Sequence, residues 1–129
     1  IDREAEPNWS KAAFLRSDKQ GVDVVVDNVG AATWESSVRM LRKGGRLLTV
    51  GGTTGYSGQT PINIVFGRQV SIIGSTMGSQ REFVDVMKLI FAGKLAVAVD
   101  RVYPLREARE AEERMKAGEH FGKILLEVA

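Results

Sequence analysis

The fold class is decided by residues 21–30, which have the sequence GVDVVVDNVG. Valine fills every position from 22 to 26 except that of Asp23. A β-branched run that is apolar on both faces is typical of a parallel strand covered by helices on both sides. The run is followed by Asp27 and, three residues later, by Gly30. We therefore predict a buried parallel strand that ends in a glycine-containing turn.

Two further strands with glycine-rich ends follow along the chain. Residues 47–50 (LLTV) lead into Gly51-Gly52, and residues 70–73 (VSII) lead into the sequence GSTMG at 74–78. Both runs are short, apolar and rich in residues that favour strands. A short helical turn is expected at residues 64–66, between these two strands.

A helix is predicted between the first two strands. Thr33 is a suitable N-cap, and Trp34, Val38 and Leu41 lie at spacings that share one helical face. The glycine pair at 44–45 is expected to end this helix, because glycine adopts the left-handed C-terminal turn readily.

A helix follows the third strand, and the pattern changes after that helix. Ser79 and Glu82 have the spacing of a capping box, which predicts a helix that ends near Gly93. A strand at 97–103, a helix at 106–117 and a strand at 123–128 are expected after it. On the helix, Glu110–Arg114 and Glu112–Lys116 have the favourable spacing for ion pairs.

The alternation of strands and helices predicts an α/β fold with part of a doubly wound parallel sheet. In such sheets, ligands bind beyond the carboxyl ends of the strands. All three predicted strand ends in residues 21–78 carry glycine, which lets a backbone or a flat ligand approach closely. We predict that these ends form a ligand-binding edge, although glycines that only make turns would give the same pattern.

Composition and side-chain chemistry exclude several other functions. A net charge of +2 and the lack of a basic cluster argue against nucleic acid or an anionic membrane as partner. The sequence has no cysteine, which fits a cytoplasmic protein and excludes thiolate sites. No nucleophile–base pair is evident, so no catalytic residue is expected, and the single histidine, His120, is predicted to be a surface residue. Asp23 and Asp27 lack a third ligand and make no metal site.

The sequence lacks the GxGxxG phosphate loop that would identify a dinucleotide-binding domain. The residue pattern by itself therefore predicts half of a parallel α/β sheet with a ligand-binding edge, and no specific ligand. Two other functions stay open at this point. One is a fragment of an S-adenosylmethionine-dependent methyltransferase, and the other is a non-enzymatic interaction module.

Six segments in order carry a resemblance to one family. They are GVDVVVDNVG, LRKGGRLLTVGGTTG, GRQVSIIGSTMGS, FAGKL, DRVYPL and FGKILLEV. In this order and spacing they resemble the C-terminal part of the medium-chain dehydrogenases/reductases, which include zinc-type alcohol dehydrogenases and quinone oxidoreductases. The resemblance covers residues 21–129 and, loosely, 1–20.

The resemblance implies a set of residues that would bind a nicotinamide dinucleotide, NAD or NADP. They are Asn28, Val29, Gly30, Val50, Gly51, Gly52, Ser75, Met77, Gly122 and Lys123. Residues 28–30 would line the nicotinamide ribose, and residues 50–52 would lie against the nicotinamide ring. The carbonyl of Val50 would accept a hydrogen bond from the carboxamide of that ring. The backbones of Ser75 and Met77 would bind the same carboxamide. Residues 122–123 would lie near the pyrophosphate or the adenosine ribose.

The resemblance also implies a domain organisation and an activity. Residues 1–78 would be the second half of a Rossmann domain, and residues 79–129 would return to a GroES-like catalytic domain. The chain would then be a C-terminal fragment, inactive alone, of an oxidoreductase that transfers hydride between nicotinamide and a carbonyl, alcohol or activated alkene. Any zinc ligands would precede it, and no metal ligand is expected within it. A homodimer through the strand at 70–75 is implied as well.

Overall fold

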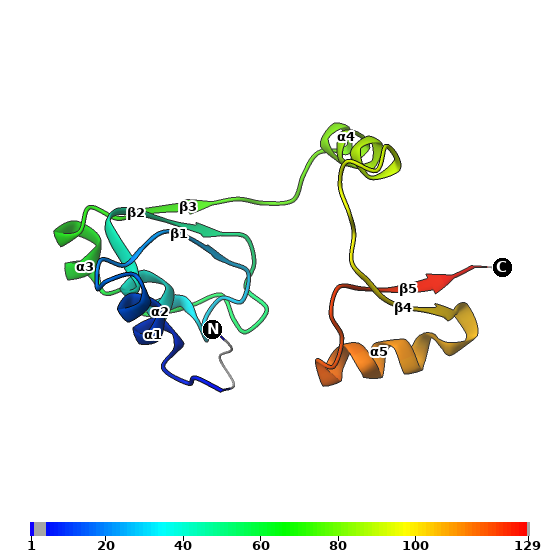
Figure 1. Ribbon diagram of the computed structural model, residues 1–129, viewed down its shortest axis with the longest axis horizontal. Coiled ribbons are helices and arrows are strands. Elements are labelled where there is room, and N and C mark those ends of the chain that lie inside the picture. The colour runs from blue at the N-terminus through cyan, green and yellow to red at the C-terminus, as the bar shows by residue number, and fades with distance from the viewer. Residues whose placement is uncertain (2–4, 129) are drawn as a thin grey trace. The chain divides into compact units, whose positions relative to one another are not determined.

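The computed structural model describes residue 1 and residues 5–128. The chain divides into two compact units, Ile1–Met77 and Gly78–Ala129, each with its own parallel sheet (Figure 1). The described residues contain no helix that is long and apolar enough to cross a membrane.

The first unit is a three-stranded parallel sheet with the strand order β1-β2-β3. Val25 of β1 pairs with Leu47 of β2, which pairs with Ile72 of β3. The predicted strands are therefore confirmed as neighbours in one parallel sheet, and β1 and β3 are its edges. In chain order the elements are α1 (Trp9–Arg16), β1 (Val22–Asp27), α2 (Trp34–Arg39), β2 (Leu41–Thr49), α3 (Ile62–Gly67) and β3 (Ser71–Gly74).

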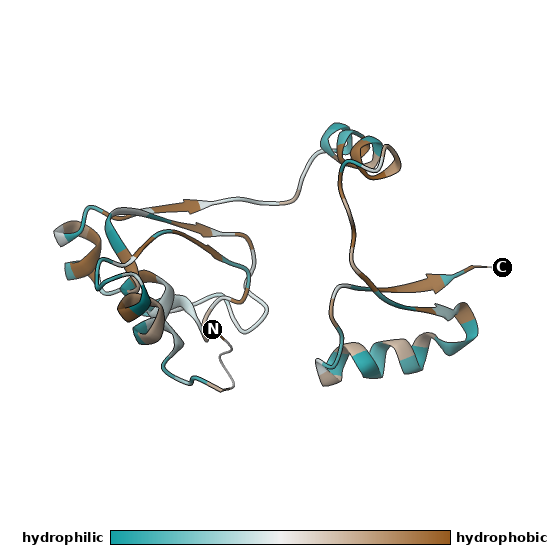
Figure 2. Ribbon diagram, viewed as in Figure 1, coloured by the Kyte–Doolittle hydropathy of each residue, from teal (hydrophilic) through white to brown (hydrophobic). Residues whose placement is uncertain are grey.

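The core of this unit lies on one face of the sheet. Its buried apolar residues are Val25, Val38, Leu41, Leu47 and Val70. Helices α2 and α3 both pack against this cluster. On the opposite face, the side chains of Val24 and Val26 are 46% and 63% exposed, and the strands are apolar along much of their length (Figure 2). The prediction of a first strand buried on both faces is thus wrong within this unit, because its packed helices lie on one face.

The helix expected to run through Leu41 is shorter than predicted. Helix α2 stops before Leu41, which begins β2, and Gly44 lies inside that strand. Val22 pairs with Leu41 but Val24 pairs with Arg46, so the residues between them on β2 bulge out of the ladder. Gly44 supplies the left-handed backbone that this bulge needs, with φ of +71°. The glycine pair therefore makes a strand bulge, and the prediction that it ends a helix is wrong.

The second unit begins with an amphipathic helix and continues as a β-α-β motif. Its elements are α4 (Gln80–Phe91), β4 (Val99–Pro104), a 3-10 turn (Leu105–Glu107), α5 (Ala108–Ala117) and β5 (Lys123–Glu127). The predicted capping box is confirmed, because Ser79 accepts from the Glu82 N–H and the Glu82 carboxylate accepts from the Ser79 N–H at 2.6 Å. Helix α5 lies along the parallel strands β4 and β5, with Tyr103 and Ala111 buried between them (Figure 1).

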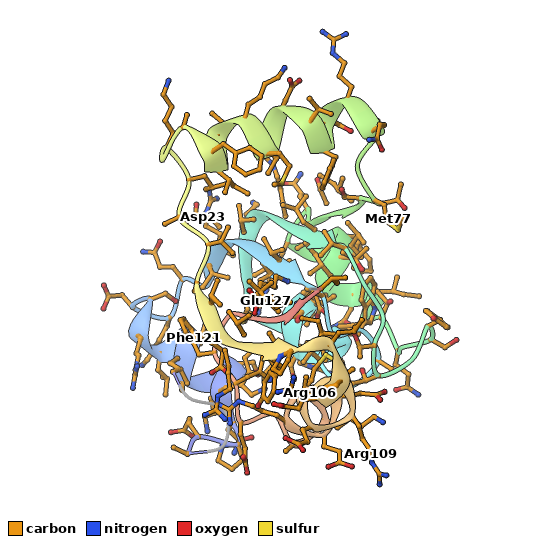
Figure 3. All side chains as sticks on the ribbon, turned by 90° about the vertical axis from the view of Figure 1, so that its right-hand side faces the viewer. Asp23, Met77, Arg106, Arg109, Phe121 and Glu127 are labelled. Carbon is orange, nitrogen blue, oxygen red and sulfur yellow. The ribbon has the colours of Figure 1, made fainter. Side chains whose placement is uncertain are left out.

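An ion pair fastens α5 to β4. Arg114 donates to both carboxylate oxygens of Asp100, at 2.8 and 3.1 Å, and does not pair with Glu110 as predicted. The predicted pair of Glu112 with Lys116 is confirmed at 3.1 Å. The hydrogen bonds from Arg114 lower the pKa of Asp100 to about 2, against the opposing effect of desolvation. Figure 3 shows Arg106 and Arg109 at the start of the same helix segment, where their side chains are exposed.

Candidate functional site

A pocket of about 630 Å³ lies at the carboxyl ends of the three strands in the first unit. Its lining residues are Gly30, Ala31, Trp34, Thr49, Val50, Gly51, Gly52, Gly55, Tyr56, Ser57, Gly58, Thr60, Ser75, Thr76 and Met77. The turns after β1, β2 and β3 all contribute to this wall. The structure thus brings the three predicted strand ends together around one cavity.

Most of the predicted binding residues border this pocket. Gly30, the segment 50–52, Ser75 and Met77 line it, and Met77 is labelled on the segment after β3 in Figure 3. Asn28 and Val29 lie directly before Gly30 but are not among the lining residues.

Gly122 and Lys123 lie in the second unit, at the start of β5. Gly122 has a local reason to be glycine, since it has a φ of +95° and a Cβ there would collide with the backbone of Ala98. The Lys123 N–H donates to the Ala98 carbonyl at 2.8 Å. The backbone of Gly122 and Lys123 thus packs against and bonds to Ala98, which precedes β4.

The glycines of the pocket allow two loops to pack backbone against backbone. Gly30 has a φ of +91°, and a Cβ on it would lie 2.6 Å from the Gly55 carbonyl oxygen. A Cβ on Gly51 would lie 2.9 Å from the Asn28 carbonyl oxygen. Both glycines are therefore required by the contact between the loop after β1 and the loop after β2. Five of the residues that line the pocket are glycines, so at those positions the wall has no side chain.

Two aromatic residues of the pocket were not predicted from the sequence. The Trp34 indole N–H donates to Thr60 Oγ1 at 2.9 Å, and its ring leaves no room for a side chain at Gly58. The Tyr56 ring covers Gly52 in the same way, while Tyr56 as a whole is 98% exposed. The signal in the sequence was the run GGTTGYSG, in which an aromatic residue is flanked by glycines that it can cover.

The chemistry of the pocket is polar but uncharged. Its described lining residues offer the hydroxyls of threonine, serine and tyrosine, and include no carboxylate, amine, guanidinium or imidazole. In the part of the chain that the structure describes, no group of three or more His, Cys, Asp or Glu side chains could hold a metal ion. His120 belongs to the second unit and is half-buried, with an unpaired buried Nδ1, so the prediction of a surface histidine is only partly right. The pocket is therefore suited to holding and orienting a flat, hydrogen-bonding group.

Comparison with known proteins identifies the family. The family described as zinc-binding dehydrogenase matches residues 4–126. The chain belongs to the zinc-binding dehydrogenase family. This match confirms the predicted family and decides against the methyltransferase alternative.

Individual members of the family resemble the chain in sequence and fold. A zinc-type alcohol dehydrogenase-like protein of Schizosaccharomyces pombe is 28% identical and aligns with 99% of the chain and 38% of its own length. The alcohol dehydrogenase of Aeropyrum pernix matches with a TM-score of 0.83 at 31% identity, over 98% of the chain and 36% of its own. A crotonyl-CoA carboxylase/reductase, AntE V350A in complex with NADP, matches with a TM-score of 0.79 at 26% identity, over 98% and 34%.

Two conclusions follow from these matches. The predicted α/β class, with part of a parallel doubly wound sheet, is confirmed by the structural neighbours. The chain spans little more than a third of the length of these relatives.

Proposed function

We propose that the chain forms the nicotinamide-binding part of an NAD(P)-dependent oxidoreductase. The observation that carries this proposal is the convergence of three glycine-rich strand ends on one uncharged pocket. The structure of the AntE reductase, part of whose fold the chain shares, was solved in complex with NADP. A cofactor of this kind supplies hydride to a carbonyl or activated alkene, or accepts it from an alcohol, while the protein binds and orients the cofactor. The substrate of a protein that carries this chain would be a carbonyl, an alcohol or an activated alkene.

The backbone of the pocket suits a nicotinamide carboxamide, which has both a donor and an acceptor. The Ser75 N–H already donates to the Thr49 carbonyl at 3.0 Å, so Ser75 offers its carbonyl oxygen. Met77 would complement it with its N–H, and Val50 with its carbonyl oxygen. Gly51 and Gly52 would form the surface under the ring. These residues hold and orient the ring, and the acid–base groups of the reaction would come from outside this chain.

Energy transfer from tryptophan to reduced nicotinamide tests the proposal. The chain has two tryptophans, and Trp34 lines the pocket, so the Trp9→Phe variant leaves one donor at the site. In this variant, NADPH or NADH should quench the tryptophan fluorescence and excite nicotinamide emission, and oxidised NADP added in excess should reverse both changes. The dissociation constant should be micromolar or weaker, because the chain contains no phosphate loop to grip the pyrophosphate. Absence of any transfer at millimolar NADPH would contradict the proposal.

The proposal extends to a homodimer formed through β3. Among the residues that the structure describes, this strand pairs only with β2 and is a sheet edge, and its Ile72 and Ile73 are 38% and 42% exposed. It carries no proline or lysine, which commonly protect edges from pairing. A two-fold axis would let β3 pair with its own copy. Ile72→Pro should then give a folded monomer by light scattering and circular dichroism, whereas a folded dimeric variant would assign the contact to another surface, such as the β1 edge.

We also place the protein in the cytoplasm. Its sequence contains no cysteine, and such a chain needs no oxidising compartment.

A further inference from the structure

The carboxylate of Asp27 is buried beneath the pocket and accepts four hydrogen bonds. Asp27 ends β1 and is 3% exposed. Its Oδ1 accepts from the N–H groups of Val29 and Gly30, each at 2.9 Å. Its Oδ2 accepts from the hydroxyls of Thr33 and Ser37, at 2.8 and 2.7 Å. One side chain therefore joins the end of β1, the loop that follows it and helix α2.

The negative charge is what allows a buried group to hold this loop. Burial raises the pKa of the Asp27 carboxyl, but the bonds from Gly30, Ser37, Thr33 and Val29 outweigh it and keep the pKa below its usual value. The carboxylate therefore stays ionised at neutral pH. Bonds from N–H and O–H donors to an ionised acceptor are roughly twice as strong as those to a neutral one.

The loop held by Asp27 is in turn hydrogen-bonded to the loop after β2, which forms another part of the pocket wall. The Thr54 N–H and the Thr54 hydroxyl both donate to the Val29 carbonyl, at 2.9 and 2.8 Å. The Ala31 N–H donates back to the Gly55 carbonyl at 3.2 Å. Gly30 packs so closely against Gly55 that a Cβ would not fit. A displacement of residues 29–31 must therefore displace the loop after β2 as well.

We propose that Asp27 is a positioning residue that sets the shape of the pocket from beneath, through the loops after β1 and β2. It is not among the residues that line the cavity, so it acts through the backbone of Val29 and Gly30. The inference rests on the proposed nicotinamide function for its ligand, but the coupling of the two loops stands on the contacts alone.

The variant that tests this is Asp27→Asn, with Asp23→Asn as its matched control. Asp23 lies on the same strand, but its carboxylate is exposed and pairs with Arg42. An asparagine at position 27 keeps an acceptor for the Val29 and Gly30 N–H groups but loses the charge. Ser37→Ala is the second control, because it removes a bond to the same carboxylate on the helix side only.

Two measurements on the whole chain decide between positioning and simple anchoring of α2. Both are made at a temperature where every variant is folded by circular dichroism. Asp27→Asn should weaken NADPH binding about fivefold, the loss expected from one weakened charged hydrogen bond. It should also accelerate amide exchange at Thr54 and Ala31, whose N–H groups bridge the two loops. Asp23→Asn and Ser37→Ala should change neither by more than about twofold.

The outcomes separate this inference from the proposed function. If Asp27→Asn lowers the melting temperature but leaves NADPH affinity and exchange at Thr54 and Ala31 as in the wild type, the positioning role is overturned. If neither the wild type nor Asp23→Asn binds NADPH, the proposed function fails. In that case, faster exchange at Thr54 in Asp27→Asn alone still supports Asp27 as the residue that positions the pocket walls, and unchanged exchange overturns it.

Discussion

The two units contain the same motif, two parallel strands joined by a helix, but they differ in their buried cores and in the residues at their strand ends. In the first unit, residues 25, 38, 41, 47 and 70 form one buried cluster, and the strand ends carry glycines. In the second unit, Tyr103 and Ala111 are the buried apolar residues of the described part, and β4 ends in Pro104. In the first unit, glycines let the loops at the strand ends pack closely, and the buried Asp27 carboxylate holds the loop after β1. We expect a binding site to need these features as well as the parallel motif.

The two units also differ in why they need glycine at particular positions. Gly30 and Gly118 both have positive φ, at +91° and +71°. A Cβ on Gly30 would meet Gly55 and Gly52, whereas a Cβ on Gly118 would meet nothing within 4 Å. The first glycine is needed for both conformation and space, and the second for conformation alone.

The largest expected effect is on the core of the first unit. Leu47 is 0% exposed, so Leu47→Ala should lower the free energy of unfolding by about 2–5 kcal/mol. The matched change in the second unit, Leu126→Ala on a side chain that is 42% exposed, should cost far less. Urea denaturation of both variants measures the difference. Equal losses would mean that the two units do not differ in core packing as described.

A smaller effect separates the two glycines. Gly118→Ala should cost about 1 kcal/mol, since only the left-handed backbone is strained. Gly30→Ala adds a collision with Gly55, and should cost more and also weaken NADPH binding. Denaturation and NADPH titration measure both quantities. Equal stabilities and unchanged binding would show that the close approach of the two loops is not needed.

The ion pair of the second unit predicts a dependence on acid. Arg114 lowers the folded-state pKa of Asp100 from 3.8 to about 2. Because this pKa is depressed, the stabilisation is complete above about pH 4 and is lost as the pH falls towards 2. Asp100→Asn should therefore destabilise β4 and α5 at pH 7 but differ little from the wild type near pH 2. Amide exchange of α5 across this range measures it, and a difference that persists at pH 2 would contradict the assignment.

The smallest effect concerns the exposed surface of α5. Lys116 pairs with Glu112 at 3.1 Å, but both side chains are more than half exposed. Lys116→Ala should change the free energy of unfolding by less than about 0.5 kcal/mol, as is usual for exposed pairs on a helix. A thermal melt that moved by several degrees would show that this pair contributes more than its exposure suggests.

The sequence predicted the strands and their glycine-rich ends well, because a valine run and the glycines after it are local signals. It misplaced the end of α2, because the bulge at Gly44 depends on how β2 pairs with β1. It predicted that Glu110 would pair with Arg114, because the spacing along the helix does not show that Asp100, on strand β4, lies beside Arg114 and competes for it.

The hydrogen bonds that hold the loop after β1 were harder to predict than the positions of the strand ends. Asp27 was recognised as a strand end, but Thr33 was expected to cap α2. The Thr33 hydroxyl instead donates to Asp27, and its side chain makes no cap hydrogen bond. Four donors that are up to ten residues away meet on this carboxylate only after β1 and α2 have packed.

The central claim is that the strand ends of the first unit bind nicotinamide. The most direct test is an amide NMR titration of the chain with nicotinamide mononucleotide, which carries the ring without needing a pyrophosphate site. We expect saturable shifts at Gly30, Gly51, Ser75 and the Trp34 indole N–H, since these residues line the pocket. Shifts confined to Gly78–Ala129, or none at millimolar ligand, would contradict it.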